Sequence, residues 1–126
     1  MAQTEAPIKL GVIADQTGPL SFMGIADANV AEMVVDEINA AGGLLGRRID
    51  LRVEDGETDD GAAKAAAAKL VQREHVDVLF GGIYSSTRQA ISGPAVAEGK
   101  TLYVYPEQYE GQESNPLIFC TGPVPA

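Results

Sequence analysis

The sequence predicts an α/β fold of three layers, in which helices cover both faces of a parallel β-sheet. Short apolar runs typical of strands alternate with longer segments of helical periodicity, and few residues separate them. Five strands and three or four helices are expected, which fits a flavodoxin-like or Rossmann-like sheet with right-handed crossovers. The length of 126 residues is that of one ordinary domain with its own core.

The first half of the chain is predicted to form two strands and the helix between them. Residues 8–14 are an apolar run that ends at Asp15, as expected of a buried strand. Residues from about 23 to 41 carry apolar side chains at helical spacing, and Gly42-Gly43 ends that helix. Residues 49–53 alternate with a period of two, which predicts a half-covered strand or one at the edge of the sheet.

The second half is predicted to hold two helices and three strands. One of the polar residues 58–60 would cap an alanine-rich helix that runs to about residue 71. Pro94 must start a turn or a kink in the next helix, because proline removes a backbone donor. We predict that helix at residues 87–97 and the parallel strand order 2-1-3-4-5. The remaining strands are expected at residues 76–80, 101–105 and 117–121.

Composition narrows the possible partners. Eighteen acidic residues against nine basic ones give a net charge of −9, and scattered basic residues argue against a nucleic-acid partner. No apolar run approaches the roughly 20 residues that span a bilayer. Residues 1–7 lack the basic and apolar parts of a signal peptide.

The single cysteine, Cys120, lies in an apolar run, and we predict a buried structural thiol.

The most informative stretch is residues 78–88, where an apolar strand ends in Gly81-Gly82 and hydroxyl residues open a helix. Free backbone N–H groups and the positive end of the helix dipole meet there, which favours carboxylate, amide-oxygen or phosphate groups. Capping explains one hydroxyl, but three hydroxyls and a phenol exceed what capping needs. The residues at this helix start are Tyr84, Ser85, Ser86 and Thr87.

A second polar segment, residues 105–110, follows the next strand. Glu107 can accept hydrogen bonds from an amide or amine, and the rings of Tyr105 and Tyr109 can sandwich a small planar or cationic group. Ligands bind at the carboxyl ends of the strands in such sheets, so both segments are expected to form one pocket for a small polar solute. The alternative is a surface loop whose tyrosines pack against its own proline.

Other candidate groups receive plainer roles. Thr17 and Ser21 follow the first strand and either line the pocket or belong to a helix-capping loop. Asp55 either binds a cation or satisfies the turn and the next helix dipole, and we favour the second. His75 precedes the third strand and is predicted to point away from the cleft. Metal-ligand spacing, a dinucleotide glycine pattern and catalytic signatures are missing, so we predict no metal, cofactor or catalytic residue.

Five motifs together carry a family resemblance: residues 15–20 (DQTGPL), residues 36–47 (DEINAAGGLLGR), Asp55, residues 81–88 (GGIYSSTR) and residues 105–111 (YPEQYEG). With these motifs the chain resembles the N-terminal lobe of type I periplasmic solute-binding proteins, in the branched-chain amino acid and amide/urea group. The last motif is most similar to the amide- and urea-binding branch.

The resemblance implies a non-enzymatic periplasmic receptor whose two lobes close on a solute and present it to the membrane subunits of an ABC importer. The expected solute is an amide, a urea-like compound or an amino acid, and Glu107 points to an amine or amidine group. The alternatives are a cytoplasmic amide-sensing regulator and, less favoured, a flavodoxin-like cofactor domain. The predicted ligand-binding residues are Leu20, Tyr84, Ser85, Ser86, Thr87, Tyr105, Glu107 and Tyr109.

Members of this family are well over twice as long as this chain. We therefore interpret residues 1–126 as a single N-terminal ligand-binding lobe, truncated or excised from its second lobe. Alone, such a lobe is expected to bind solute weakly or not at all, because one wall of the cleft is missing. It is also expected to form homodimers through apolar surface that the missing segments would cover.

Overall fold

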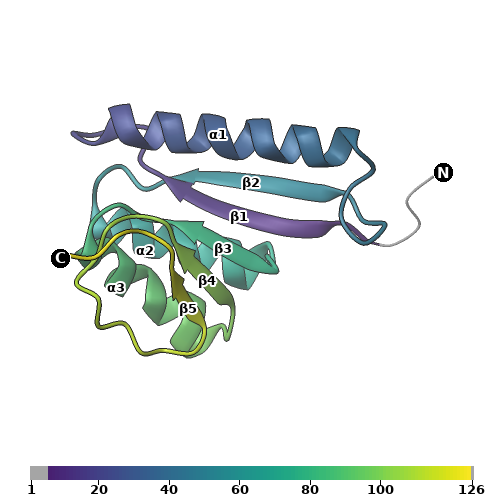
Figure 1. The fold of residues 1–126 in the computed structure, drawn as a ribbon. Helices are drawn as coiled ribbons and strands as arrows, with labels where there is room; N and C mark the ends of the chain where they lie inside the picture. Colours follow the sequence, from purple (N-terminus) through teal and green to yellow (C-terminus); the bar gives the residue numbers. More distant parts are fainter. Residues whose placement is uncertain (1–5, 126) are drawn as a thin grey trace.

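The computed structural model describes residues 6–125 and contains one five-stranded parallel sheet (Figure 1). The strand order is β2-β1-β3-β4-β5, which confirms the predicted order. β1 pairs with β2 along its whole length, from Ile8 opposite Ile49 to Ala14 opposite Asp55. The strands are β1 (Ile8–Ala14), β2 (Ile49–Asp55), β3 (Val78–Gly81), β4 (Leu102–Tyr105) and β5 (Ile118–Cys120).

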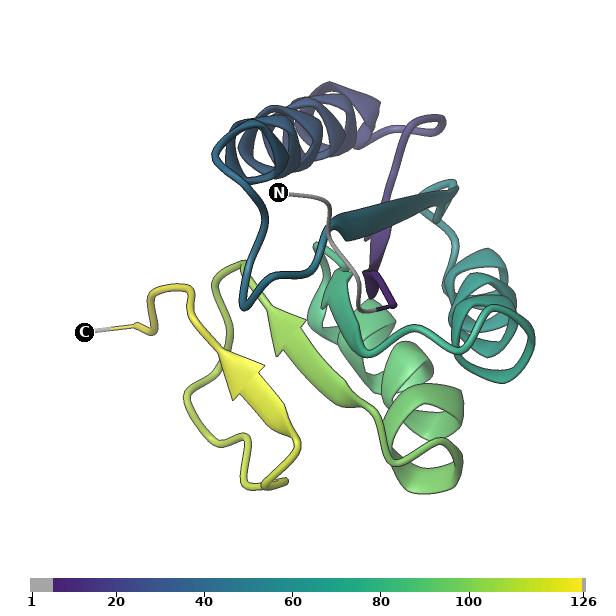
Figure 2. The same ribbon diagram turned by 90° about the vertical axis from the view of Figure 1, so that its right-hand side faces the viewer.

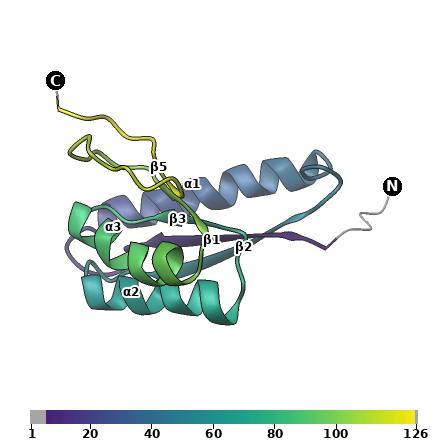
Figure 3. The same ribbon diagram turned by 90° about the horizontal axis from the view of Figure 1, so that it is seen from below.

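Helices lie on both faces of this sheet. The long helix α1 (Ser21–Ala40) packs on β1 and β2 from one side. The shorter helices α2 (Asp60–Ala68) and α3 (Ser85–Ser92) pack against each other on the opposite side, as the end-on view shows (Figure 2). In the view from below, α2 and α3 lie side by side across the sheet from α1 (Figure 3). This arrangement confirms the predicted flavodoxin-like lobe.

The larger core lies between the sheet and the pair α2 and α3. The alternation of β4 sends Tyr103 and Tyr105 into this core, where both are fully buried beside Leu79 of β3. α2 contains six alanines, whose short side chains let that helix lie close to the sheet, and three of them are buried: Ala63, Ala66 and Ala67. A smaller cluster, built on Val12, Ala14 and Ala28, joins β1 to α1.

Both shorter helices end in a π-helical turn. α2 continues through Lys69–Arg73, and α3 continues through Gly93–Glu98, where Pro94 is the second residue of the turn. The predicted change of geometry at Pro94 is confirmed. The third strand begins at Val78, two residues later than predicted, because His75 has a left-handed φ of 55° and the Val76 N–H bonds back to the Leu70 carbonyl.

Helices lie on both faces, as predicted, but the α1 face is covered only in part. The crossover from β4 to β5 is an irregular loop, so no helix from it lies beside α1 (Figure 2). Leu102 and Val104 therefore remain partly exposed on the α1 side of β4, and Phe119 of β5 is 53% exposed. Within residues 6–125, no helix has the length and apolar character needed to cross a membrane.

Candidate functional site

The turn after β3 brings the start of α3 to the carboxyl edge of the sheet. Gly81 and Gly82 have φ angles of 134° and 85°, values that side chains disfavour. A Cβ atom on Gly81 would overlap the backbone of Ile13 in the neighbouring strand β1. Gly82 donates a hydrogen bond to the Ile13 carbonyl at 3.2 Å. The glycine pair therefore lets the chain pass close against β1 before α3 begins at Ser85.

The four residues predicted at this helix start serve different purposes. The Ser85 hydroxyl donates a hydrogen bond to the carboxylate of Glu110. Tyr84 occupies the N-cap position and is 51% exposed, and Ser86 is exposed as well. Thr87 is buried, and its Oγ1 donates to Asp60 Oδ1 of α2 at 2.8 Å. The prediction for Thr87 is therefore corrected: its hydroxyl joins the starts of two helices.

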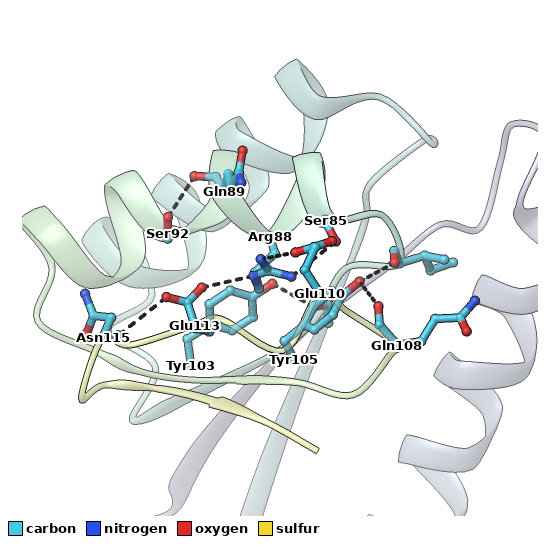
Figure 4. A network of polar contacts seen from close by, with 12 residues as sticks. Ser85, Arg88, Gln89, Ser92, Tyr103, Tyr105, Gln108, Glu110, Glu113 and Asn115 are labelled. Atoms are coloured by element: carbon cyan, nitrogen blue, oxygen red, sulfur yellow. Dashed lines mark hydrogen bonds and ion pairs between the residues drawn. The ribbon is translucent and has the colours of Figure 1, made fainter. Parts of the chain in front are cut away.

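Arg88 holds the loop after β4 against α3 (Figure 4). Its side chain is only 5% exposed and forms ion pairs of 3.0 Å with Glu110 and with Glu113. Its Nη1 also donates to Ser85 Oγ at 3.3 Å. The guanidinium lies over the rings of Tyr105 and Tyr109, with centroid distances of 5.0 and 5.7 Å. Such desolvated cation–π contacts stabilise the loop together with the ion pairs.

The two tyrosines of β4 belong to the core and not to a solvent-facing wall. The hydroxyl of Tyr105 lies within hydrogen-bond distance of the carbonyls of Ile83 and Gln108. The hydroxyl of Tyr103 donates to the Gly81 carbonyl at 2.8 Å. Burial raises the pKa of both phenols. Tyr105 is fully buried, so its ring is not available to sandwich a solute, which corrects that prediction.

Glu107 leaves β4 on the side of the sheet that α1 covers. Burial, and then the charge of Asp27 on α1, raises the pKa of Glu107. Burial and the charge of Asp15 likewise raise the pKa of Asp27. Among residues 6–125, neither the Glu107 nor the Asp27 carboxylate has a hydrogen-bond partner. Glu107 is therefore a half-buried acceptor that lies close to Asp27 of α1.

Asp55 organises the loop after β1 at the other end of the same edge. Its carboxylate accepts hydrogen bonds from Gln16 N (2.8 Å), Thr17 Oγ1 (2.8 Å) and Glu57 N (2.8 Å). The favoured prediction for Asp55, a turn-stabilising role, agrees with these contacts. Thr17 therefore bonds Asp55 and caps no helix, while α1 begins after Leu20 without a side-chain cap. No cluster of potential metal ligands occurs within the described part of the chain.

An open hollow of about 410 Å³ lies at the start of α3, and we call it the α3 hollow. Three short segments line it: residues 83–85, 108–110 and 123–125. Of the predicted ligand-binding residues, it brings together Tyr84, Ser85 and Tyr109. The other five predicted residues lie outside its lining: Leu20, Ser86, Thr87, Tyr105 and Glu107. A second hollow, of about 510 Å³, lies between α1 and β2 and has none of the predicted residues.

Sequence reasoning missed three residues that shape this site, Arg88, Glu110 and Glu113. Glu110 and Arg88 stood in the family motifs, but neither was predicted to contact a ligand or to shape the pocket. A signal for Arg88 was present, because it follows Ser85 by three residues and such residues share a helix face. Glu113 carried no comparable signal, since the irregular loop that places it beside Arg88 has no periodicity.

The strand order and the hollow define a parallel α/β lobe with an open surface at the carboxyl edge of its sheet. The chain matches the periplasmic binding protein family over residues 7–126, and it belongs to this family. Among curated proteins it is similar to Leu/Ile/Val-binding protein homolog 7 of Brucella suis biovar 1, with 37% identity over 97 residues. That match covers 77% of this chain and 24% of the relative.

A second curated relative gives the same result. Leu/Ile/Val-binding protein homolog 8 of Brucella abortus is 36% identical over 93 residues, which cover 74% of this chain and 22% of the relative. The chain thus spans about a quarter of the length of the curated relatives that it matches.

Solved structures agree on the fold. A type 1 periplasmic binding protein from Bordetella pertussis superposes with a TM-score of 0.81 at 21% identity, over 94% of this chain and 34% of that one. An ABC-type branched-chain amino acid transporter protein from Rhodopseudomonas palustris gives a TM-score of 0.79 at 26% identity, over 93% and 33%. The fold is therefore that of one lobe of a type I periplasmic binding protein, as the motifs predicted.

Proposed function

We propose that this chain is the N-terminal ligand-binding lobe of a periplasmic solute-binding component of an ABC import system. Membership of the periplasmic binding protein family supports solute binding without chemical conversion. The α3 hollow is the single structural observation that carries the proposal, because it lies at the carboxyl edge of a parallel sheet, where such folds bind ligands. The partners would be a second lobe and the membrane subunits of the importer.

We propose a neutral amide or a urea-like compound as the solute, with an amino acid as the second choice. The Ser85 hydroxyl and the Glu110 carboxylate supply hydrogen-bonding groups to the α3 hollow. A neutral amide has N–H donors for the carboxylate and a carbonyl acceptor for backbone N–H groups at the start of α3. The exposed ring of Tyr84 would cover the apolar part of the solute.

The lobe alone presents only one wall of the proposed cleft. Pockets that bind small solutes tightly bury most of the ligand surface, whereas the α3 hollow is open to solvent. We therefore expect titration calorimetry of this chain with acetamide, urea or leucine to show no binding in the millimolar range. Millimolar or tighter binding would contradict the expectation that a second lobe is needed.

Nuclear magnetic resonance tests the proposed location. High concentrations of acetamide or urea should shift the backbone amide signals of residues 83–86 and 108–110 and leave those of β2 and α1 unchanged. Shifts confined to the hollow between α1 and β2 would contradict the proposal, because that hollow lies away from the carboxyl edge. An absence of shifts at the start of α3 with every solute would contradict it as well.

A further inference from the structure

The α3 hollow contains one charged side chain among its lining residues, and that side chain is Glu110. Its carboxylate accepts hydrogen bonds from the Ser85 hydroxyl and from Arg88 Nη2, the latter at 3.0 Å. The first of these contacts lowers the pKa of Glu110, and the Arg88 contact acts in the same direction. A negative charge therefore stands beside the first turn of α3, where the carboxylate of a solute would otherwise bind.

Arg88, the cation that pairs with Glu110, is buried and bonded inside the protein. Arg88 is 5% exposed, and its guanidinium donates to Glu110, to Glu113 and to Ser85. The guanidinium also lies over the rings of Tyr105 and Tyr109. Two carboxylates balance this single guanidinium, so it offers no net positive charge to a solute. Figure 4 shows Glu110 lying between Ser85 and Arg88.

We propose that Glu110 is a specificity-determining residue that excludes carboxylate groups from the α3 hollow, and that Arg88 is the positioning residue that holds it there. An anion entering the hollow would meet a fixed carboxylate of like charge and a Ser85 hydroxyl that is already donating. A neutral head group with N–H donors would instead bond the free lone pairs of Glu110. This inference rests on the proposed solute site and adds the rule by which that site selects.

The test compares acetamide with acetate, which have the same shape and differ in charge. Backbone amide spectra of the wild-type chain are recorded with each probe at equal concentration, with ionic strength balanced by sodium chloride. We expect acetamide to shift the signals of residues 85–87 and acetate to leave them in place. Equal shifts with both probes in the wild-type chain would overturn the inference.

Glu110→Ala removes the carboxylate and leaves a space of the size of acetate beside Ser85 and Arg88. Acetate should then bind there and shift the signals of residues 85–87, with an apparent affinity raised about tenfold or more over the wild type. A merely structural role for Glu110 predicts no such gain, because loosening the loop creates no anion site. Failure of Glu110→Ala to gain acetate binding would overturn the inference.

Glu113→Ala is the matched control, because Glu113 also pairs with Arg88 but does not contact Ser85. This variant should remain unresponsive to acetate at residues 85–87, since Glu110 still occupies that position. Glu110→Gln, which keeps the size of the side chain, should lose the exclusion of acetate if Glu110→Ala does not fold. If acetamide fails to shift wild-type signals while acetate behaves as described, the proposed function fails and the exclusion rule stands.

Discussion

Replacement of Arg88 by methionine should destabilise this lobe strongly. Methionine keeps an apolar stem of similar length but removes every donor of the guanidinium. The change leaves the carboxylate of Glu113, which is 20% exposed, without its charged partner. It also removes the cation from the rings of Tyr105 and Tyr109. The side chain of Arg88 is 5% exposed, so water does not replace these contacts in the folded state.

The magnitude follows from the individual contacts. The charged hydrogen bond to Glu113, at 3.0 Å, contributes about 2 kcal/mol. Each ring contact adds about 0.5 kcal/mol at these distances. The pair with Glu110 is left out, because that carboxylate is exposed and screened by solvent. The expected loss is therefore about 3 kcal/mol, a large part of the roughly 5–15 kcal/mol that stabilises a domain.

Urea denaturation followed by circular dichroism measures this loss. With a slope of about 1.5 kcal/mol per molar, the midpoint should fall by about 2 M. Arg52→Met is the control, because Arg52 also pairs with two carboxylates, Asp50 and Glu74, but its side chain is 41% exposed. An equal fall of the midpoint in both variants would refute the argument from burial, and no fall in Arg88→Met would refute it altogether.

Four further outcomes are expected. Burial alone would raise the pKa of Asp55, but hydrogen bonds from the Thr17 hydroxyl and from three backbone N–H groups, those of Gln16, Thr17 and Glu57, lower it. At pH values above the ordinary carboxyl pKa, Asp55→Ala should therefore lower the free energy of unfolding by about 1–2 kcal/mol. Urea denaturation should show this difference shrinking as the pH falls through the lowered pKa of Asp55. Burial raises the pKa of Asp27, so Asp27→Asn should stabilise the lobe near neutral pH and have no effect well below about pH 3.9; an equal gain at both pH values would contradict this. Gly81→Ala should cost about 2 kcal/mol or more in a thermal melt, since its Cβ overlaps β1. We propose that the partly covered face around Phe119 binds a second copy of this chain, so light scattering should show a dimer that Phe119→Asp dissociates, and a wild-type monomer at high concentration would contradict this.

Much of the fold could be predicted because its signals are local. Apolar runs and helical spacing identified each element, and the known preference for right-handed parallel crossovers then limited the sheet to few orders. The positions of Thr87 and Tyr105 were harder, although the sequence carried part of the answer. Residue 87 is two positions from Ser85 and so lies on nearly the opposite face of the helix. Tyr105 shares the period-two alternation of the strand with Tyr103, which sends both inward.

The contacts of Glu110 and Glu113 could not be predicted from the sequence by the same reasoning. Both lie in the irregular connection between β4 and β5, where no repeat relates a residue to its direction. Their places are set by Arg88, which lies more than twenty positions earlier in the chain. An ion pair between residues so far apart in the sequence can be identified only from the structure, in which the loop after β4 lies against α3.

The irregular loop between β4 and β5 also divides the lobe into a stiff part and a compliant part. β5 has three residues and pairs with β4 alone, so its local opening requires less free energy than unfolding of the central strands. Ser85 stands on the stiff side, whereas Tyr109 and Glu110 stand on the compliant side. Hydrogen exchange should therefore be fast in β5 and slow in β1 and β3. A binding surface built in this way can adapt one side to a solute while the other keeps its geometry.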